Sequence, residues 1–483
     1  MKRLAGIDAA FLYLETPSMH SHVVASIVLD PSTSPEPFDL ARMKQLLDAR
    51  MHLLAPFRRR LAWVPFNLSH PVWIEDPDFD LDDHVHHTTL PAPGTVEQLA
   101  TLVGEIASRP IDRSRPLWEL WYVDGLHGDA GGHVDGDLVA LITKIHHSAI
   151  DGVTGADLMA QLFDLDADAA VEPETPSTWE PEPVPNPLVL ASDALAHVLS
   201  NPGKLVRVLA RSLQSFADAF QEVRTPSVDH PSPALPLTAP RVRWSASITP
   251  SRDVAFSRAA LDDLRAVKSH FGVTVNDVVL AACTLAIRAY LLAHDDLPED
   301  PLICSVPVSV RGQTDIDASN QVSAMFVRLP VQLDDPGEVL ATIHGETKAA
   351  KVMQSAIGAK TLQELAQFIP GAAFNQAARL YSSLHLADRH KPIHNVIISN
   401  VPGPPVPLFA AGAQVRSVVP LGPLMEGAGL NITVLSNMGN VDFGVVGCTE
   451  LVPDIWDLAS AFPAAVAALL ALVDQQPPVE SSA

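Results

Sequence analysis

A stretch rich in proline and glutamate constrains the fold more than any other feature of this sequence. Residues 170–187 read AVEPETPSTWEPEPVPNP, and neither a helix nor a central strand continues through prolines at this density, because proline lacks the backbone N–H donor. A second such stretch covers residues 225–240. The sequence therefore predicts two folded parts, residues 1–165 and 243–475, a crossover over residues 166–242, and a disordered tail at 476–483.

Both parts mix helical and strand patterns. Residues 38–54 and 95–108 have helical spacing in the first part, and Thr274 is placed to cap a long apolar helix in the second. Residues 302–312 read as a buried strand, and the run from 429 to 448 reads as two antiparallel strands. We expect an α/β protein with one mixed sheet and flanking helices in each part, and a site where the two parts meet.

Composition and charge exclude several classes of function. The 483 residues carry 32 basic and 56 acidic side chains, a net charge of -24, which argues against nucleic acid and against attraction of the whole molecule to anionic lipid. Cys283, Cys304 and Cys448 lie far apart in apolar surroundings and are expected to be buried thiols of a reducing compartment. The apolar run 464–473 is short for a bilayer span, so we expect a cytoplasmic protein that is soluble or lies on a membrane surface.

The residues from Leu138 to Gly152, LVALITKIHHSAIDG, form the most informative stretch. An apolar run with β-branched residues ends at His146 and His147, so both histidines are expected at the end of a buried strand. Neighbouring strand residues project to opposite sides, so one histidine faces a given cavity and the other braces it. A neutral imidazole of fixed tautomer can take a proton from an alcohol. The simpler alternative is a structural pair, with Asp151 capping the next helix.

Other polar clusters have ordinary alternatives. The arginines at 58, 59 and 60 suit a solvated turn or a phosphate site. The histidines at 84, 86 and 87 lack further ligands at zinc-like spacing, so no metal is expected. Residues 204–224 suit a helix with an apolar face and a basic face, which either packs on the protein or rests on a membrane or lipid droplet.

Further polar residues lie at predicted element ends. Asn276 and Asp277 occupy the first turn after Thr274, and Arg311 ends the buried strand 302–312. A strand at 120–123 could pair with the strand before His146. The remaining candidates are Pro116, Leu117 and Trp118 before strand 120–123, and Ser399 and Asn400 at the end of another strand.

These blocks together resemble a known family. HHSAIDG matches the HHxxxDG signature of the superfamily that includes chloramphenicol acetyltransferase, plant acyltransferases and peptide-synthetase condensation domains. The blocks IDAAFLYLETP, PLWELWYVDGL, TVNDVVLA, PVSVR, SNVPGP and GLNITVLSNMG are similar to the bacterial wax ester synthase/acyl-CoA:diacylglycerol acyltransferase family. The resemblance covers nearly the whole chain except residues 166–240.

The resemblance implies two domains related to chloramphenicol acetyltransferase, a tunnel between them, and acyl transfer from long-chain acyl-coenzyme A to diacylglycerol or a long-chain alcohol. Acyl-coenzyme A is then a co-substrate, and no permanently bound cofactor is expected. His147 is implied as the general base, His146 as its support, and Asp151 as a structural residue paired with Arg311. Asn276, at a helix N-terminus, could donate to the oxyanion. The motif-lining residues are Gly152, Pro116, Leu117, Trp118, Asp277, Ser399 and Asn400.

Two other functions fit the same residues. One is an acyltransferase of this fold that acts on a polyketide or sugar hydroxyl, and the other is a catalytically inactive lipid-binding protein. A serine hydrolase is disfavoured, because Ser148 lacks a G-x-S-x-G setting.

Overall fold

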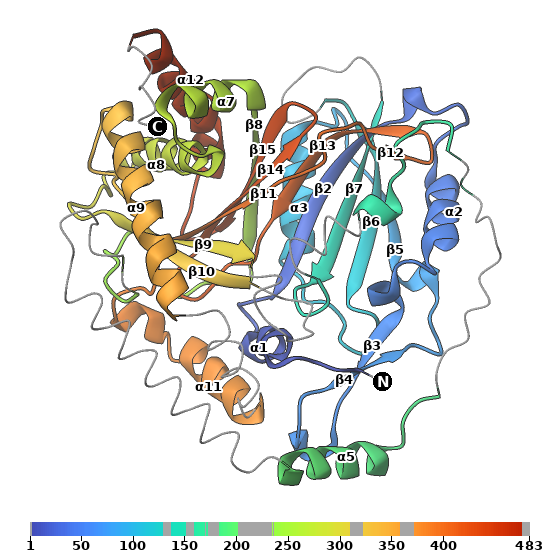
Figure 1. Cartoon of the computed structure of the whole chain (residues 1–483). Coiled ribbons are helices and arrows are strands. Elements are labelled where there is room, and N and C mark those ends of the chain that lie inside the picture. The colour runs from blue at the N-terminus through green and yellow to red at the C-terminus, as the bar shows by residue number, and fades with distance from the viewer. Residues whose placement is uncertain are drawn as a thin grey trace.

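The computed structural model describes residues 2–128, 137–150, 159–169, 171, 183–200, 234, 236–309, 322–357 and 371–475. These residues form two six-stranded sheets that lie side by side, each flanked by helices, and a small three-stranded sheet near the N-terminus (Figure 1). The predicted helix at 204–224 and most of the two proline-rich stretches lie outside the described residues.

The first large sheet has the strand order β12-β13-β2-β7-β6-β5. Strand β7 pairs antiparallel with both β2 and β6, which confirms the predicted pairing beside the strand that ends at His146. Side chains alternate along β2, so that Ile27 packs with helix α2 on one face and Val28 packs with helix α3 on the other. The elements are β2 His22–Asp30, α2 Leu40–Arg50, β5 Val85–Thr89, α3 Val96–Ala107, β6 Trp118–Leu126, β7 Leu138–His146, β12 Phe409–Ala410 and β13 Ala413–Leu421.

The second large sheet has the order β10-β9-β11-β14-β15-β8. Thr274 caps helix α8 through a capping box, and β14 and β15 form a hairpin at Asn437 and Asn440; both features were predicted. The three cysteines are buried and free, as expected. The elements are β8 Arg252–Ala260, α7 Leu261–Phe271, α8 Val275–Ala293, β9 Leu302–Ser309, β10 Val322–Leu329, α9 Pro336–Ile357, β11 Val396–Val401, β14 Leu430–Asn437, β15 Asn440–Cys448 and α12 Ile455–Gln475.

Helices α8 and α12 are long and apolar enough to cross a membrane by length and composition alone. They pack against each other, however, and α12 also packs against β8. Core helices of large domains have the same composition, so this is weak evidence for a membrane span.

Two strands from late in the chain complete the first sheet. Strand β13 pairs antiparallel with β2, and β12 pairs with β13, although both come from the range predicted as the second part. Strand β13 also packs against β15, where a Cβ on Gly444 would lie 2.1 Å from the Pro420 carbonyl oxygen. This glycine allows the two sheets to approach closely, and the sheets therefore do not divide at one point of the chain.

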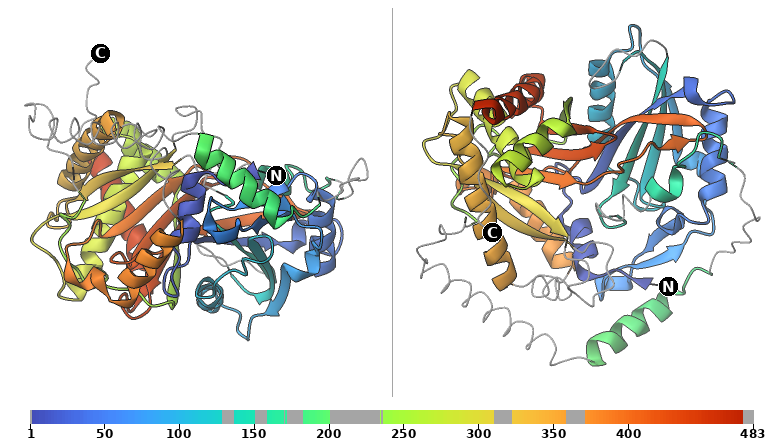
Figure 2. Two further views of the ribbon diagram at one scale, coloured as in Figure 1. Left: turned by 90° about the horizontal axis from the view of Figure 1, so that it is seen from below. Right: turned by 45° about the horizontal axis from the view of Figure 1, so that its top comes forward.

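The small sheet has the order β1-β4-β3 and lies below the first large sheet, beside helix α1 (Figure 2). Helix α5 packs on it through Leu190, which meets Val72 and Ile74 of β4. Helix α11 comes from the second part and packs against α1. The elements are β1 Lys2–Arg3, α1 Gly6–Leu14, β3 Arg59–Ala62, β4 Val72–Glu75, α5 Pro187–Ser200 and α11 Gly371–Ser383, with short 3₁₀ helices at Pro31–Thr33, Ala55–Arg58, Pro65–Asn67, Leu81–Asp83 and Leu386–Arg389.

Candidate active site at the histidine turn

The two histidines lie at the end of β7, as predicted. The His146 backbone N–H donates to the Leu117 carbonyl oxygen at 2.9 Å, and the His147 N–H donates to the Ser21 carbonyl oxygen at 2.7 Å. These bonds tie the strand end to the neighbouring chain on both sides, because Leu117 precedes β6 and Ser21 precedes β2. The turn formed by His147, Ser148 and Ala149 thus starts from a fixed backbone position.

His146 is buried, and its contacts define its tautomer. Its Nδ1 accepts the backbone N–H of Ser148 at 3.0 Å and lies 2.7 Å from the Ser148 hydroxyl oxygen. A backbone N–H can only donate, so Nδ1 carries no proton and the ring proton lies on Nε2. This Nε2 faces Glu15 Oε1 at 3.2 Å. The geometry suits the supporting role predicted for His146.

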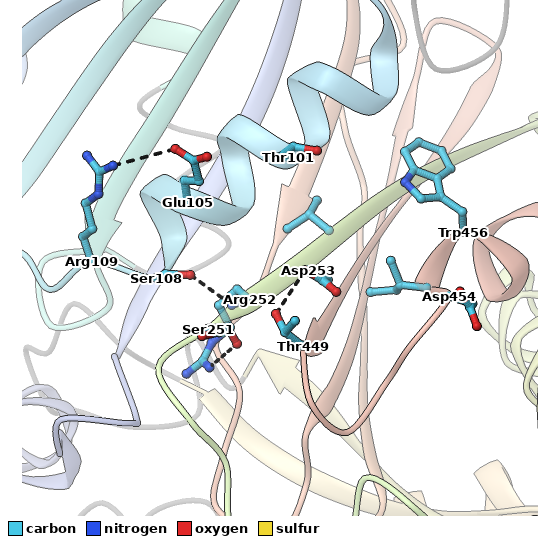
Figure 3. A pocket seen from close by; sticks show the side chains of 12 residues that line it. Thr101, Glu105, Ser108, Arg109, Ser251, Arg252, Asp253, Thr449, Asp454 and Trp456 are labelled. Carbon is cyan, nitrogen blue, oxygen red and sulfur yellow. Dashed lines mark hydrogen bonds and ion pairs between the residues drawn. The ribbon is translucent and has the colours of Figure 1, made fainter.

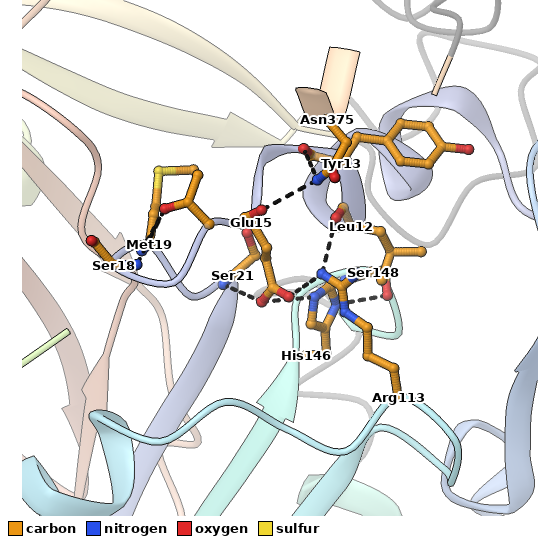
Figure 4. Close-up of polar contacts among 11 residues, drawn as sticks. Leu12, Tyr13, Glu15, Ser18, Met19, Ser21, Arg113, His146, Ser148 and Asn375 are labelled. Atoms are coloured by element: carbon orange, nitrogen blue, oxygen red, sulfur yellow. Dashed lines mark hydrogen bonds and ion pairs between the residues drawn. The ribbon is translucent and has the colours of Figure 1, made fainter. Parts of the chain in front are cut away.

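Glu15, at the end of α1, is the charged centre of this network (Figure 4). Its Oε1 accepts the Ser21 backbone N–H at 2.7 Å, and its Oε2 pairs with the Arg113 guanidinium. Burial alone would raise the pKa of Glu15, but the contacts with His146, Arg113 and the Ser21 N–H outweigh it and lower that pKa. The carboxylate is therefore ionised at neutral pH and holds the turn from one side.

His147 is half-buried and has a different environment. Its imidazole stacks on the Phe11 ring, with ring centroids 4.2 Å apart and an interplanar angle of 8°. Phe11 and Glu15 are four residues apart and thus lie on one face of α1. One helix face therefore contacts both histidines, with Phe11 on His147 and Glu15 on His146.

The second part of the chain reaches the site through α11. The Asn375 side-chain amide donates to the backbone oxygens of Tyr13, at 2.8 Å, and of Glu15, at 3.3 Å. A Cβ on Gly371 would lie 2.3 Å from the Tyr13 ring, so only glycine allows α11 to approach α1 this closely. The position of α1 over the histidines therefore depends on both parts.

The residues of the PLW block lie next to the strand end. Leu117 is buried and accepts the His146 N–H, and Trp118 pairs across the ladder with Ile145. The Trp118 ring is stacked between Phe57 and His84, both at a centroid distance of 4.6 Å. The block thus supports β7 by packing and backbone bonding. The Pro116 carbonyl oxygen accepts the Trp118 N–H at 2.9 Å.

Buried basic groups lie behind the turn. Lys144, two residues before His146, is buried, and its Nζ lies 3.4 Å from Glu119 Oε2. Burial lowers the pKa of Lys144. His22 pairs with His146 in the ladder and donates from Nε2 to the Ala107 carbonyl oxygen at 2.8 Å. Burial lowers the pKa of His22, so this imidazole is neutral at pH 7.

Asn276 and Asp277, the two site residues predicted at the start of α8, have different roles in the structure. Asp277 is buried and accepts bonds from the Thr274 N–H at 2.9 Å, the Thr347 hydroxyl at 2.7 Å and His344 Nδ1 at 2.9 Å. Burial would raise the pKa of Asp277, but these bonds lower it. Asp277 therefore fastens α8 to α9 and is fully engaged in doing so.

Asn276 is half-buried, and its side-chain oxygen accepts from the Asn400 amide at 3.4 Å. Asn400 follows Ser399 near the end of β11, so the structure brings these predicted residues together. The bond between Asn276 and Asn400 does not itself involve His147. The oxyanion role of Asn276 stays a prediction.

Three predicted residues, Asp151, Gly152 and Arg311, lie outside the described part of the chain, as does the predicted Asp151–Arg311 ion pair. Sequence reasoning missed Phe11, Glu15, Arg113 and Asn375. The sequence contains little indication of their roles. Phe11 and Glu15 belong to the block IDAAFLYLETP, which pointed to the family but did not indicate a function for either residue.

The other clusters have structural partners. Arg59 pairs with Glu75 at 3.0 Å and Arg60 with Asp76 at 2.9 Å, which leaves these two charges neutralised. His84 is stacked on Trp118, and His87 pairs with Asp124. Where the chain is described, His294, Asp454 and Asp457 have potential ligand atoms within 4.8 Å of one another, and both carboxylates are exposed.

A pocket of about 600 Å³ lies between helix α3 of the first part and strand β8 and the start of helix α12 of the second (Figure 3). Glu105, Ser108 and Arg109 line it from the first part, and Arg252 and Trp456 line it from the second. The backbone N–H of Arg252 donates to the Ser108 hydroxyl at 2.9 Å, which links the two parts at the pocket wall. His147 is not among the residues that line this pocket. The tunnel at His147 therefore stays a prediction.

Comparisons with known proteins identify the family. Residues 4–279 match the wax ester synthase/diacylglycerol acyltransferase catalytic domain, and residues 318–469 match the WS/DGAT C-terminal domain. A protein of Mycobacterium tuberculosis strain H37Rv that carries the name "putative diacyglycerol O-acyltransferase" is 38% identical over 482 residues, which cover 99% of this chain and 92% of that protein.

Solved structures agree with this match. The wax ester synthase/diacylglycerol acyltransferase from Marinobacter aquaeolei VT8 aligns with a TM-score of 0.67 and 28% identity, over 98% of this chain and 100% of its own. A trichothecene 15-O-acetyltransferase from Fusarium sporotrichioides aligns with a TM-score of 0.57 at 14% identity, over 98% of this chain and 95% of its own, and shows the shared fold alone. The predicted α/β fold with two mixed-sheet domains is confirmed. The chain belongs to the wax ester synthase/diacylglycerol acyltransferase family.

Proposed function

We propose that this protein transfers a long-chain fatty acyl group from acyl-coenzyme A to the hydroxyl of diacylglycerol, forming triacylglycerol, and that it also accepts long-chain alcohols and forms wax esters. One observation carries the proposal: in a chain of this family, the HHxxxDG strand end holds a half-buried imidazole, His147, beside a second histidine whose tautomer is fixed.

His147 acts as the general base in this mechanism. The imidazole takes the proton of the acceptor hydroxyl as its oxygen attacks the thioester carbon, and a tetrahedral oxyanion forms. Collapse of the oxyanion breaks the carbon–sulfur bond, and the coenzyme A thiolate leaves with the proton from His147. No acyl-enzyme is required, and a placed base of this kind supplies about 10²- to 10⁴-fold in rate.

The other site residues support this base. Asn276, in the first turn of α8, donates to the oxyanion, because a side-chain amide at a helix N-terminus favours developing negative charge. Asp151 and Arg311 pair and hold the loop that follows His147. Glu15 faces His146 and is itself paired with Arg113, and together they hold the supporting histidine.

We place the protein in the cytoplasm, in peripheral contact with a membrane or lipid droplet. The acceptors are water-insoluble, so the enzyme must draw them from a lipid phase. The net charge of -24 disfavours a strongly anionic surface. Helix α5 supports the contact, because Leu188 and Val189 are exposed on it.

Labelled acyl-coenzyme A and phosphatidylcholine vesicles that contain diacylglycerol test the proposed reaction. The purified protein should form labelled triacylglycerol, and His147→Ala should lower the rate about 10²- to 10⁴-fold. His87→Ala is the matched control, since His87 is an exposed histidine of β5 that pairs with Asp124 of β6. Equal rates in wild type and His147→Ala would contradict the role of His147.

A competition experiment measures which acceptor the enzyme prefers. Diacylglycerol and hexadecanol are supplied in one reaction, and the labelled triacylglycerol and wax ester are separated and counted. A panel with polyketide and sugar hydroxyls tests the alternative acceptors. Binding of acyl-coenzyme A without any product would favour a lipid-binding protein instead.

A further inference from the structure

Phe11 and His147 form the closest ring pair at the proposed site. Their centroids are 4.2 Å apart and their planes differ by 8°, so one face of the imidazole lies flat on the phenyl ring. Both side chains are half-buried. Within the described residues, Phe11 is not among the side chains that build or line the hydrophobic clusters of the core.

Helix α1 presents Phe11 rigidly. Its opposite side is buried through Ala9, Leu12 and Tyr13, which pack in one cluster with Leu117. Its C-terminal end is held by Asn375 from α11. The phenyl ring therefore cannot follow a moving imidazole at low cost, and instead restricts the imidazole to one plane.

From this geometry we infer that Phe11 is a positioning residue for the general base, an assignment that rests on the proposed function of His147. The phenyl face fixes the plane of the imidazole before the reaction. It also stabilises the imidazolium that forms when His147 takes the hydroxyl proton, because a cation over an aromatic face is attracted to its negative centre. Phe11 thus acts on the transition state more than on substrate binding.

The charged groups described near the turn are engaged with other partners. Glu15 and Arg113 are paired with each other, and Glu15 faces His146 rather than His147. Lys144 lies near Glu119. Among the described residues, the ring contact recorded for His147 is the one with Phe11.

Substitutions that separate packing from the aromatic face test the inference. Phe11→Leu keeps an apolar side chain but removes the ring, whereas Phe11→Tyr and Phe11→Trp keep a ring. We expect Phe11→Leu to lower kcat about 3- to 30-fold, with the KM values for acyl-coenzyme A and diacylglycerol within about twofold of wild type. The two aromatic variants should stay within about threefold in kcat, and circular dichroism and melting temperature should confirm that all variants fold.

Fluorinated phenylalanines at position 11 sharpen the test, because they weaken the negative ring face at nearly constant shape. The logarithm of kcat should fall stepwise with added fluorine. Unchanged kcat in Phe11→Leu, or equal losses in the leucine and aromatic variants, would overturn the inference.

A double-mutant cycle separates this inference from the proposed function. In the His147→Ala background, Phe11→Leu should have no further effect on the residual rate. An additional loss in that background would show that Phe11 acts independently of His147 and would overturn the inference. An inactive wild type would instead refute the proposed function itself.

Discussion

The histidine turn at the end of β7 and the start of α8 both gather polar side chains at the end of a buried element, yet they are held differently. At the turn, two side chains from the α1 segment contact the two histidines: Glu15 faces His146, and Phe11 stacks on His147. Both imidazole rings are therefore held by residues that lie outside β7. At α8, the strong bonds belong to Asp277 and join two helices. Within the described part of the chain, the Asn276 side chain accepts a long bond from Asn400, at 3.4 Å.

This difference separates catalysis from fold stability. Contacts at the turn orient the histidines of the proposed mechanism, so their loss should lower turnover as well as stability. Contacts of Asp277 hold α8 on α9, so their loss should appear mainly in the free energy of unfolding. Asn276 uses its side-chain oxygen in the bond to Asn400, whereas its proposed role at the oxyanion would use its amide N–H. Substitutions in each region test this division.

Among the residues that surround the histidines and the start of α8, Glu15→Ala should have the largest effect. The substitution leaves Arg113 and the Ser21 N–H without their acceptor and frees the His146 ring. We expect kcat to fall about 100-fold and the protein to lose roughly 2–4 kcal/mol of stability, because breaking a largely buried pair exposes the remaining charge to an apolar environment. Turnover assays and urea unfolding at pH 7 measure the two effects.

Glu75→Ala is the control, because Glu75 is also a mostly buried carboxylate paired with an arginine, Arg59, but lies on the small sheet. It should leave kcat within about twofold, since a partly exposed pair away from the turn contributes mainly to local stability.

The pKa of folded Glu15 is lowered, so its stabilising contribution is present above the unfolded pKa of about 4.3 and is lost as pH falls towards the folded value. The stability difference between wild type and Glu15→Gln should therefore shrink below about pH 4. A constant difference down to pH 2.5 would contradict this.

Asp277→Ala should have the next largest effect. It leaves three donors, from Thr274, His344 and Thr347, without a buried acceptor. We expect a loss of about 2–4 kcal/mol in urea unfolding, because an unsatisfied buried donor such as the Thr347 hydroxyl costs about 1–3 kcal/mol, whereas the more exposed Thr274 and His344 can turn to water. The kcat of the folded fraction should stay within about threefold of wild type.

Thr347→Val removes one of these three bonds at nearly constant volume and should cost about 1 kcal/mol. A 100-fold loss of kcat in folded Asp277→Ala would remove the distinction between the two regions.

Local signals predicted most of the fold. The hairpin at Asn437 and Asn440, the Thr274 cap and the strand before His146 all follow from side-chain periodicity and turn chemistry within a few residues. The pairing of β13 with β2 could not be predicted in this way, because it joins segments far apart in sequence and nothing within β13 specifies its partner.

The sequence predicted only those site residues that are neighbours along the chain. His146 and His147 are adjacent, and their motif marks them directly. Glu15 gives no such signal, because an acidic residue at a helix end before Thr-Pro is ordinarily solvated. Its burial depends on α1 packing against β7 and on Arg113, which precedes β6. Asp277 was assigned to the site lining, and the partners that show its structural role, His344 and Thr347, lie on α9.

Asn375→Ala should have a much smaller effect than Glu15→Ala and tests how far the turn depends on the second part of the chain. It removes the amide that donates to the Tyr13 and Glu15 backbone oxygens. Because Asn375 is half-buried and water can replace it, we expect a loss of about 1 kcal/mol in stability. The kcat should fall about two- to fivefold, since α1 still packs through Tyr13 but holds Phe11 and Glu15 less firmly. Gln376→Ala is the matched control, because Gln376 is the exposed neighbour on the same helix. A kcat loss as large as that of Glu15→Ala would mean that α11, rather than the pairing of Glu15 with Arg113, sets the position of the histidines.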